Sequence, residues 1–197
     1  MQSEKLIQAL LEQTEQIINQ VENLKTYDLH TLTWRENETS WNILECLEHL
    51  NLYGDFYLPQ MESKIKSSNT KAGSEFKSGL LGNYFAKSML PKEKLNKMKT
   101  FKDKNPLNVR LDKMVIDKFI DQQIKLLELV NQSRKVSLNK VKIPTSISSL
   151  IRLKLGDTFQ FFINHIIRHL SQIDRIQAAI KNAYRPTGVL ETIRKTA

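Results

Sequence analysis

The sequence predicts an all-α protein, a bundle of four helices with a long crossover between the second and third. In four long stretches the apolar residues recur every three or four positions, the spacing of amphipathic helices. The connections between these stretches are very unequal, and the longest covers residues 67–111. A connection of that length can cross a whole bundle, so the helices it joins need not be antiparallel. No convincing pair of strands is visible.

The first predicted helix covers residues 2–25, and the third covers residues 112–135. Apolar residues on the first keep the helical spacing at Leu6, Leu10, Ile17, Val21 and Leu24. We expect the buried face of the third to hold Ile116, Phe119, Ile120, Gln123, Ile124, Leu127 and Val130.

The second predicted helix runs over residues 42–66 and has a recognisable start. Asn42 can cap it, and Glu45 follows three residues later in a variant of the capping box. Trp41 stands where a hydrophobic staple would pack. Pro59 predicts either a kink or an early end, because proline cannot donate the backbone hydrogen bond of a helix.

The fourth predicted helix begins after Gly156, with Asp157 as its cap, and continues to about Ala183. Its apolar stripe is expected to hold Phe159, Phe162, Ile166, Leu170, Ile173, Ile176 and Ile180. Within the long connection, residues 80–89 favour a short helix. We predict one domain over residues 1–186 and a tail over 187–197.

Composition indicates a globular protein of the cytoplasm without membrane contact. No run of eighteen or more apolar residues occurs, so no spanning helix is expected. The single cysteine, Cys46, cannot form an intrachain disulfide and fits a reducing compartment. We expect Cys46 to be a small buried residue. The alternative is that its side chain reaches the functional site, because it lies on the second helix.

The net charge of +9 raises the hypothesis of nucleic-acid binding. Ten lysines and arginines against four acids lie between Lys87 and Lys118, mostly in the long connection. We favour a solvated, lysine-rich connection there, because the interleaved aromatic residues of a stacking platform are missing.

Three histidines suggest a metal site. His165 and His169 are four residues apart, so on a helix they point the same way. His49 lies on the inward stripe of the second helix. Three neutral imidazoles can bind a divalent transition metal and leave positions open for water or substrate. The alternative is a set of core histidines satisfied by hydrogen bonds, and we place His30 at the surface.

Other residues near the histidines have a functional and a structural interpretation. Glu45 would either orient His49 or accept a proton as a catalytic group, or it would only cap its helix. Gln172 would either form a hydrogen bond to a metal-binding side chain without contacting the metal itself, or only satisfy neighbouring polar groups. Tyr53, Phe161 and Phe162 are expected to pack. The inner face of the fourth helix offers no carboxylate beside the histidines, which disfavours a di-iron carboxylate site.

Two stretches, Trp41–Leu50 and His165–Ile173, together resemble the DinB/YfiT-like superfamily. The resemblance covers most of the chain and implies a four-helix bundle of up-down-down-up order. It also implies a divalent metal, nickel or zinc, held by His49, His165 and His169, and it suggests a homodimer. Some relatives are S-transferases of low-molecular-weight thiols, and others are isomerases or hydrolases.

The sequence therefore predicts a metal-dependent enzyme that activates a thiol or water for transfer or hydrolysis on a small molecule, with a low-molecular-weight thiol as a candidate partner. Two alternatives stay open: a metal-binding or stress-response bundle without catalysis, and a nucleic-acid binder that uses the lysine-rich connection.

Overall fold

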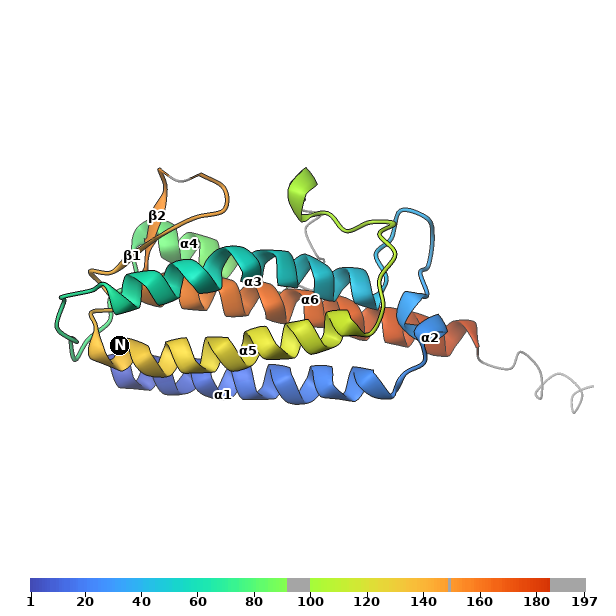
Figure 1. Cartoon of the computed structure of the whole chain (residues 1–197), viewed down its shortest axis with the longest axis horizontal. Coiled ribbons are helices and arrows are strands. Elements are labelled where there is room, and N and C mark those ends of the chain that lie inside the picture. Colours follow the sequence, from blue (N-terminus) through green and yellow to red (C-terminus); the bar gives the residue numbers. More distant parts are fainter. Residues whose placement is uncertain (92–99, 149, 185–197) are drawn as a thin grey trace, which may run out of the picture.

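Four long helices form the body of the protein in a computed structural model that describes residues 1–91, 100–148 and 150–184 (Figure 1). They are α1 (Ser3–Glu22), α3 (Ile43–Lys66), α5 (Met114–Gln132) and α6 (Leu155–Ala183). Helix α3 contacts α5 and α6, and α1 contacts the same two helices. The prediction of a mainly helical protein is therefore confirmed.

Shorter elements occupy the connections. Between α1 and α3 lie η1 (Asn23–Thr26) and α2 (Leu29–Thr33). The long crossover contains α4 (Leu80–Ser88), which confirms the short helix expected there, and η2 (Lys102–Lys104). A turn of 3-10 helix, η3 (Ser133–Lys135), follows α5. The predicted tail 187–197 and residues 92–99 of the lysine-rich connection lie outside the described residues.

A small antiparallel hairpin corrects the expectation of no strand pair. Strand β1 (Lys142–Pro144) pairs with β2 (Arg152–Lys154), and Ile143 lies opposite Leu153. Each strand has three residues, which is too few to display the period of two that reveals a strand in a sequence. The hairpin leads directly into α6 and contacts α3 and α6.

The start of α6 differs from the prediction. The helix begins at Leu155, so Asp157 lies in its first turn and is not its cap. The Asp157 carboxylate is buried and instead accepts hydrogen bonds from the Ser78 hydroxyl and from the Gly79 backbone N–H. These bonds tie the N-terminal end of α4 to α6, which explains why an aspartate stands there.

Apolar side chains from all four long helices form one core. The predicted stripes of α1 and α6 enter it, except that Ile176 and Ile180 at the end of α6 are half-buried. On α5, the expectation that Ile124 is buried is wrong, because that side chain is 48% exposed. Leu127 is only half-buried, and Leu126 and Leu129 are buried, so the inner face differs from the prediction in the second half of α5. The other predicted residues are buried: Ile116, Phe119, Ile120, Gln123 and Val130.

Pro59 neither ends nor shortens α3, which continues to Lys66. The proline lies at an exposed position of the helix. In the part of the chain that the structure describes, no helix is long and apolar enough to cross a membrane.

Candidate metal centre

Three buried histidines meet between α3 and α6. The Nε2 atom of His165 lies 3.3 Å from Nε2 of His49 and 3.1 Å from Nε2 of His169. Each ring offers one nitrogen, and the three nitrogens lie within 4.8 Å of one another. The structure therefore brings together all three residues that the sequence selected, across 116 positions of the chain.

Local sequence explains how each ring reaches this point. His165 and His169 are one turn apart on α6, whose core-facing side chains fix which face turns inward. On α3, Asn42 and Glu45 form a complete capping box, with Asn42 Oδ1 accepting from Glu45 N at 2.8 Å. The box defines the first turn, and His49 lies one turn after Glu45 on the inward side.

Two of the imidazoles are oriented through their other nitrogen. His49 Nδ1 donates to the backbone carbonyl of Lys104 at 2.6 Å, and His169 Nδ1 donates to Gln172 Oε1 at 3.0 Å. These tautomers follow from the acceptors present, and they leave a lone pair on each Nε2. The Nδ1 atom of His165 is buried without a hydrogen-bond partner among the described residues.

Burial keeps the three rings neutral. It lowers the pKa of His49 to about 4 and, with the neighbouring His49, that of His169 to about 3. Burial also holds the pKa of His165 well below its ordinary value, since a charged imidazole would lose its water there. At neutral pH the rings therefore present lone pairs, which is the form that binds a metal ion.

Two of the three nitrogen–nitrogen separations fit ligands of one divalent ion. Two nitrogens about 2.1 Å from a common ion, at an angle of roughly 90–110°, lie about 3.0–3.4 Å apart. The two separations of 3.1 and 3.3 Å fall in that range. His49, His165 and His169 are the residues that could hold the ion.

Aromatic rings enclose the histidines. The ring centroid of Trp41 lies 4.7 Å from that of His49 and 5.8 Å from that of His169. The Tyr53 ring lies 4.7 Å from that of His165, and burial raises the pKa of Tyr53 to about 12. The Tyr53 hydroxyl thus keeps its proton at neutral pH.

The centre opens into a cleft of about 1300 Å³, which we call the histidine cleft. It is lined by α3, α4, α6 and residues on either side of the undescribed segment 92–99, together with the three histidines, Trp41 and Tyr53. A volume of this size accommodates a small molecule next to the three nitrogens.

The crossover is held against the start of α3 by a group of hydrogen bonds that we call the crossover latch. Glu45 Oε1 accepts from the backbone N–H of Asn108 at 2.6 Å and from Arg35 at 2.9 Å. Arg35 also donates to Asn108 Oδ1 at 2.8 Å, and Trp41 Nε1 donates to Asn105 Oδ1 at 3.1 Å. The latch fixes the segment whose Lys104 carbonyl orients His49.

Glu45 is fully occupied by this arrangement. Its second oxygen, Oε2, accepts from the backbone N–H of Asn42 at 2.9 Å, and the side chain is buried. The structure thus gives Glu45 the capping role, while its catalytic role stays a prediction. Gln172 contacts His169 as the sequence analysis considered.

Cys46 and His30 lie away from the centre. Cys46 is fully buried and does not line the histidine cleft, and burial raises the pKa of its thiol far above the usual range. His30 is exposed, as predicted, and lies on the short helix α2.

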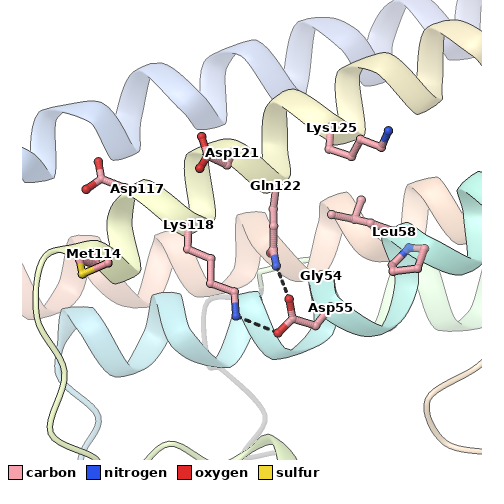
Figure 2. A pocket seen from close by; sticks show the side chains of 10 residues that line it. Gly54, Asp55, Leu58, Met114, Asp117, Lys118, Asp121, Gln122 and Lys125 are labelled. Atoms are coloured by element: carbon pink, nitrogen blue, oxygen red, sulfur yellow. Dashed lines mark hydrogen bonds and ion pairs between the residues drawn. The ribbon is translucent and has the colours of Figure 1, made fainter.

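A second hollow, the α3/α5 groove, has a different character (Figure 2). It has a volume of about 520 Å³ and contains no histidine. Within it, Asp55 accepts from Lys118 and from Gln122, both at 2.8 Å. The three histidines of the predicted metal site line the histidine cleft and not this groove.

Sequence reasoning missed the contribution of the crossover. The carbonyl of Lys104 orients His49, but a backbone carbonyl belongs to every residue and leaves no mark in a sequence. Tyr53 was expected only to pack, although its spacing of four from His49 placed it on the same face of α3.

Comparison with known families gives one match. A family model described as the DinB superfamily matches residues 10–173, which include all three histidines, the whole of α3 and α5 and about two thirds of α1 and of α6. Comparisons with curated proteins and with solved structures give no match.

Proposed function

The chain belongs to the DinB superfamily, and from that premise we propose that it is a metal-dependent enzyme acting on a small molecule. The reaction we propose is the activation of a thiol or of water for transfer or hydrolysis. The observation that supports this most directly is the convergence of the Nε2 atoms of His49, His165 and His169 in a buried, neutral cluster.

A bound divalent ion supplies Lewis-acid chemistry here, because its charge lowers the pKa of a coordinated thiol or water. We propose nickel or zinc, since both accept imidazole nitrogen. His49, His165 and His169 would hold the ion. The Lys104 carbonyl and Gln172 keep two of these rings in the tautomer that leaves Nε2 free.

The remaining residues of the cleft bind and enclose the substrate. Trp41 packs against the His49 and His169 rings and keeps water from that side. Tyr53 borders His165 and, with its proton retained, donates a hydrogen bond to a polar group of the substrate. In this proposal Glu45 acts structurally, because both of its oxygens are already engaged.

The proposal includes the finer architecture that the family implies. Figure 1 supports an up-down-down-up four-helix bundle, because α1 and α6 run in one direction and α3 and α5 in the other. A single domain over residues 1–186, a homodimer and a cytoplasmic location stay predictions.

Elemental analysis of protein purified without chelators tests the metal site. We expect about one nickel or zinc ion per chain, lost in the His49→Ala variant and kept in the His30→Ala variant. Titration of the metal-free protein with each ion should give one site. A chain that neither contains nor binds a divalent ion would refute the proposal.

Activity is tested with the metal-loaded protein, a panel of low-molecular-weight thiols and a chromogenic electrophile such as 1-chloro-2,4-dinitrobenzene, and with chromogenic esters and amides for hydrolysis. Turnover that disappears in His165→Ala supports catalysis. Metal binding without turnover on the panel would favour the non-catalytic bundle.

Binding of nucleic acid with a steep salt dependence would instead support the lysine-rich connection as the functional region.

A further inference from the structure

Cationic side chains outnumber carboxylates in the histidine cleft. Among its described lining residues, Lys87, Arg168 and Arg175 are cationic and Glu36 is the only acid. The described walls of the cleft therefore carry a net positive charge that attracts anions.

Two of these cations are aligned with the histidines on α6. Arg168 is adjacent in sequence to His169, and Arg175 follows seven residues later, which places both on one side of the helix. Seven residues of helix span about 10 Å. A positive strip thus extends from the metal centre toward the C-terminal end of α6.

Arg175 and Lys87 keep their charge available to a ligand. Both side chains belong to exposed residues of the cleft, and neither takes part in an ion pair with the carboxylates that the structure describes. Lys87 lies in the last turn of α4, so it comes to the cleft from a different element than Arg175. A guanidinium offers two parallel N–H donors that match an anionic oxygen group.

Aromatic and apolar side chains line part of the remaining cleft wall, beside uncharged polar ones. Besides Trp41 and Tyr53, it includes Tyr84 and Phe85 of α4 and Phe161 and Ile176 of α6. Tyr84 is 67% exposed, so it is open to contact with a ligand. These surfaces favour a ligand whose body is apolar or aromatic.

We propose that the substrate of the histidine cleft is a small molecule with an apolar body and an anionic oxygen group, which Arg175 binds with support from Lys87 and Arg168. The inference rests on the proposed function, because the metal centre supplies the reacting end of the cleft. The anionic group, a carboxylate or a phosphate monoester, lies toward the C-terminal end of α6, and the reacting group lies at the histidines.

The test uses three probes that share one apolar body: 3-phenylpropanoate, 3-phenylpropyl phosphate and the neutral 3-phenylpropanamide. Each is titrated calorimetrically into the zinc-loaded full-length protein at low and moderate salt. We expect at least one anionic probe to bind about tenfold or more tightly than the amide, with an affinity that falls as salt rises. Whichever anion binds better identifies the anionic group.

The metal ion itself attracts anions, so variants are needed to distinguish its contribution to probe binding from that of Arg175. Arg175→Gln should weaken the preferred anionic probe by about fivefold to tenfold and leave zinc affinity within twofold. Lys87→Gln should act in the same direction to a smaller extent. Lys181→Gln is the matched control, because Lys181 is an exposed cation on the same helix that does not line the cleft.

Equal binding of the amide and both anions would overturn the inference, and so would an Arg175→Gln variant that binds like the Lys181→Gln control. Failure of the proposed function looks different: zinc would not bind to any variant. In that case the same titrations on metal-free protein still decide the inference, since the preference for an anion must again depend on Arg175.

Discussion

The histidine cleft and the α3/α5 groove are both hollows along α3, but their polar atoms behave in opposite ways. In the groove, the Asp55 carboxylate already accepts hydrogen bonds from Lys118 and Gln122. In the cleft, the Nε2 atoms of His49 and His169 both lie within 3.3 Å of Nε2 of His165. The charged pair of the groove is thus complete without a ligand, whereas the neighbouring lone pairs of the histidines can bind one.

Burial strengthens this contrast. The Asp55 and Lys118 side chains are 49% and 44% exposed, so solvent stabilises them with or without the pair. The three histidines are each at most 9% exposed, and their nitrogens have lost water. Losing water without a full replacement costs free energy. A bound ion offsets that cost.

Removing His165 should have the largest effect, because it is the ring that lies within 3.3 Å of both others. Loss of an outer partner of a ligand typically costs 10–100-fold in metal affinity, so losing the ligand itself should cost at least about 100-fold. Zinc titration of His165→Ala measures this, with His30→Ala as the control. If His165→Ala binds zinc as tightly as the wild type, the histidine cleft is not a metal site and does not differ from the α3/α5 groove in this respect.

Removing Gln172 should have the next largest effect. Its Oε1 accepts from His169 Nδ1 and holds that ring in one tautomer, so Gln172→Ala should weaken zinc binding by about tenfold. Gln172→Glu retains an acceptor at this position and should preserve most of the affinity. If both variants bind zinc like the wild type, the bond to His169 does not support the metal.

Opening the crossover latch should have a moderate effect on zinc and a clear effect on stability. Glu45→Gln weakens the bonds to Arg35 and Asn108 and should lower the free energy of unfolding by about 2–3 kcal/mol. Zinc affinity should fall by several-fold, because the Lys104 carbonyl is held less firmly against His49.

Ring nitrogen chemical shifts of His49 in the zinc-loaded Glu45→Gln variant distinguish positioning from general destabilisation, since only loss of position changes the tautomer. Glu48→Gln, on the same helix, is the matched control. A destabilised Glu45→Gln variant with unaltered His49 shifts and zinc affinity would show that the latch serves stability alone.

A change in the α3/α5 groove should have the smallest effect. Asp55→Asn removes one half-exposed ion pair and should change the free energy of unfolding by at most about 1 kcal/mol. Zinc and probe affinities should equal those of the wild type. Chemical denaturation and zinc titration check both statements, and a loss of zinc binding would show that the two hollows are coupled.

The sequence predicted the long helices and the histidine triad because both leave periodic signals. The apolar spacing marks α1 and α6, and His165 and His169 are four residues apart on one face. The capping box at Asn42 and Glu45 also follows a local pattern, and the structure contains it in full.

Features that depend on tertiary contact could not be predicted. The β1–β2 hairpin is too short for a period, and Asp157 binds Ser78 and Gly79 from a distant segment although it stands where a cap would. The exposed Ile124 shows that the apolar pattern of α5 permits more than one rotation of the helix. Packing against α1 and α3 selects one of them.

The spacing of the three histidines along the chain also sets an order of assembly. A single helical turn of α6 creates the pair His165 and His169, at little cost in chain entropy. His49 is 116 residues away from His165, and its arrival requires closure of most of the polypeptide. A zinc ion that binds early to His165 and His169 can then coordinate His49 when the distant segment arrives. Zinc should therefore accelerate refolding as well as stabilise the folded protein.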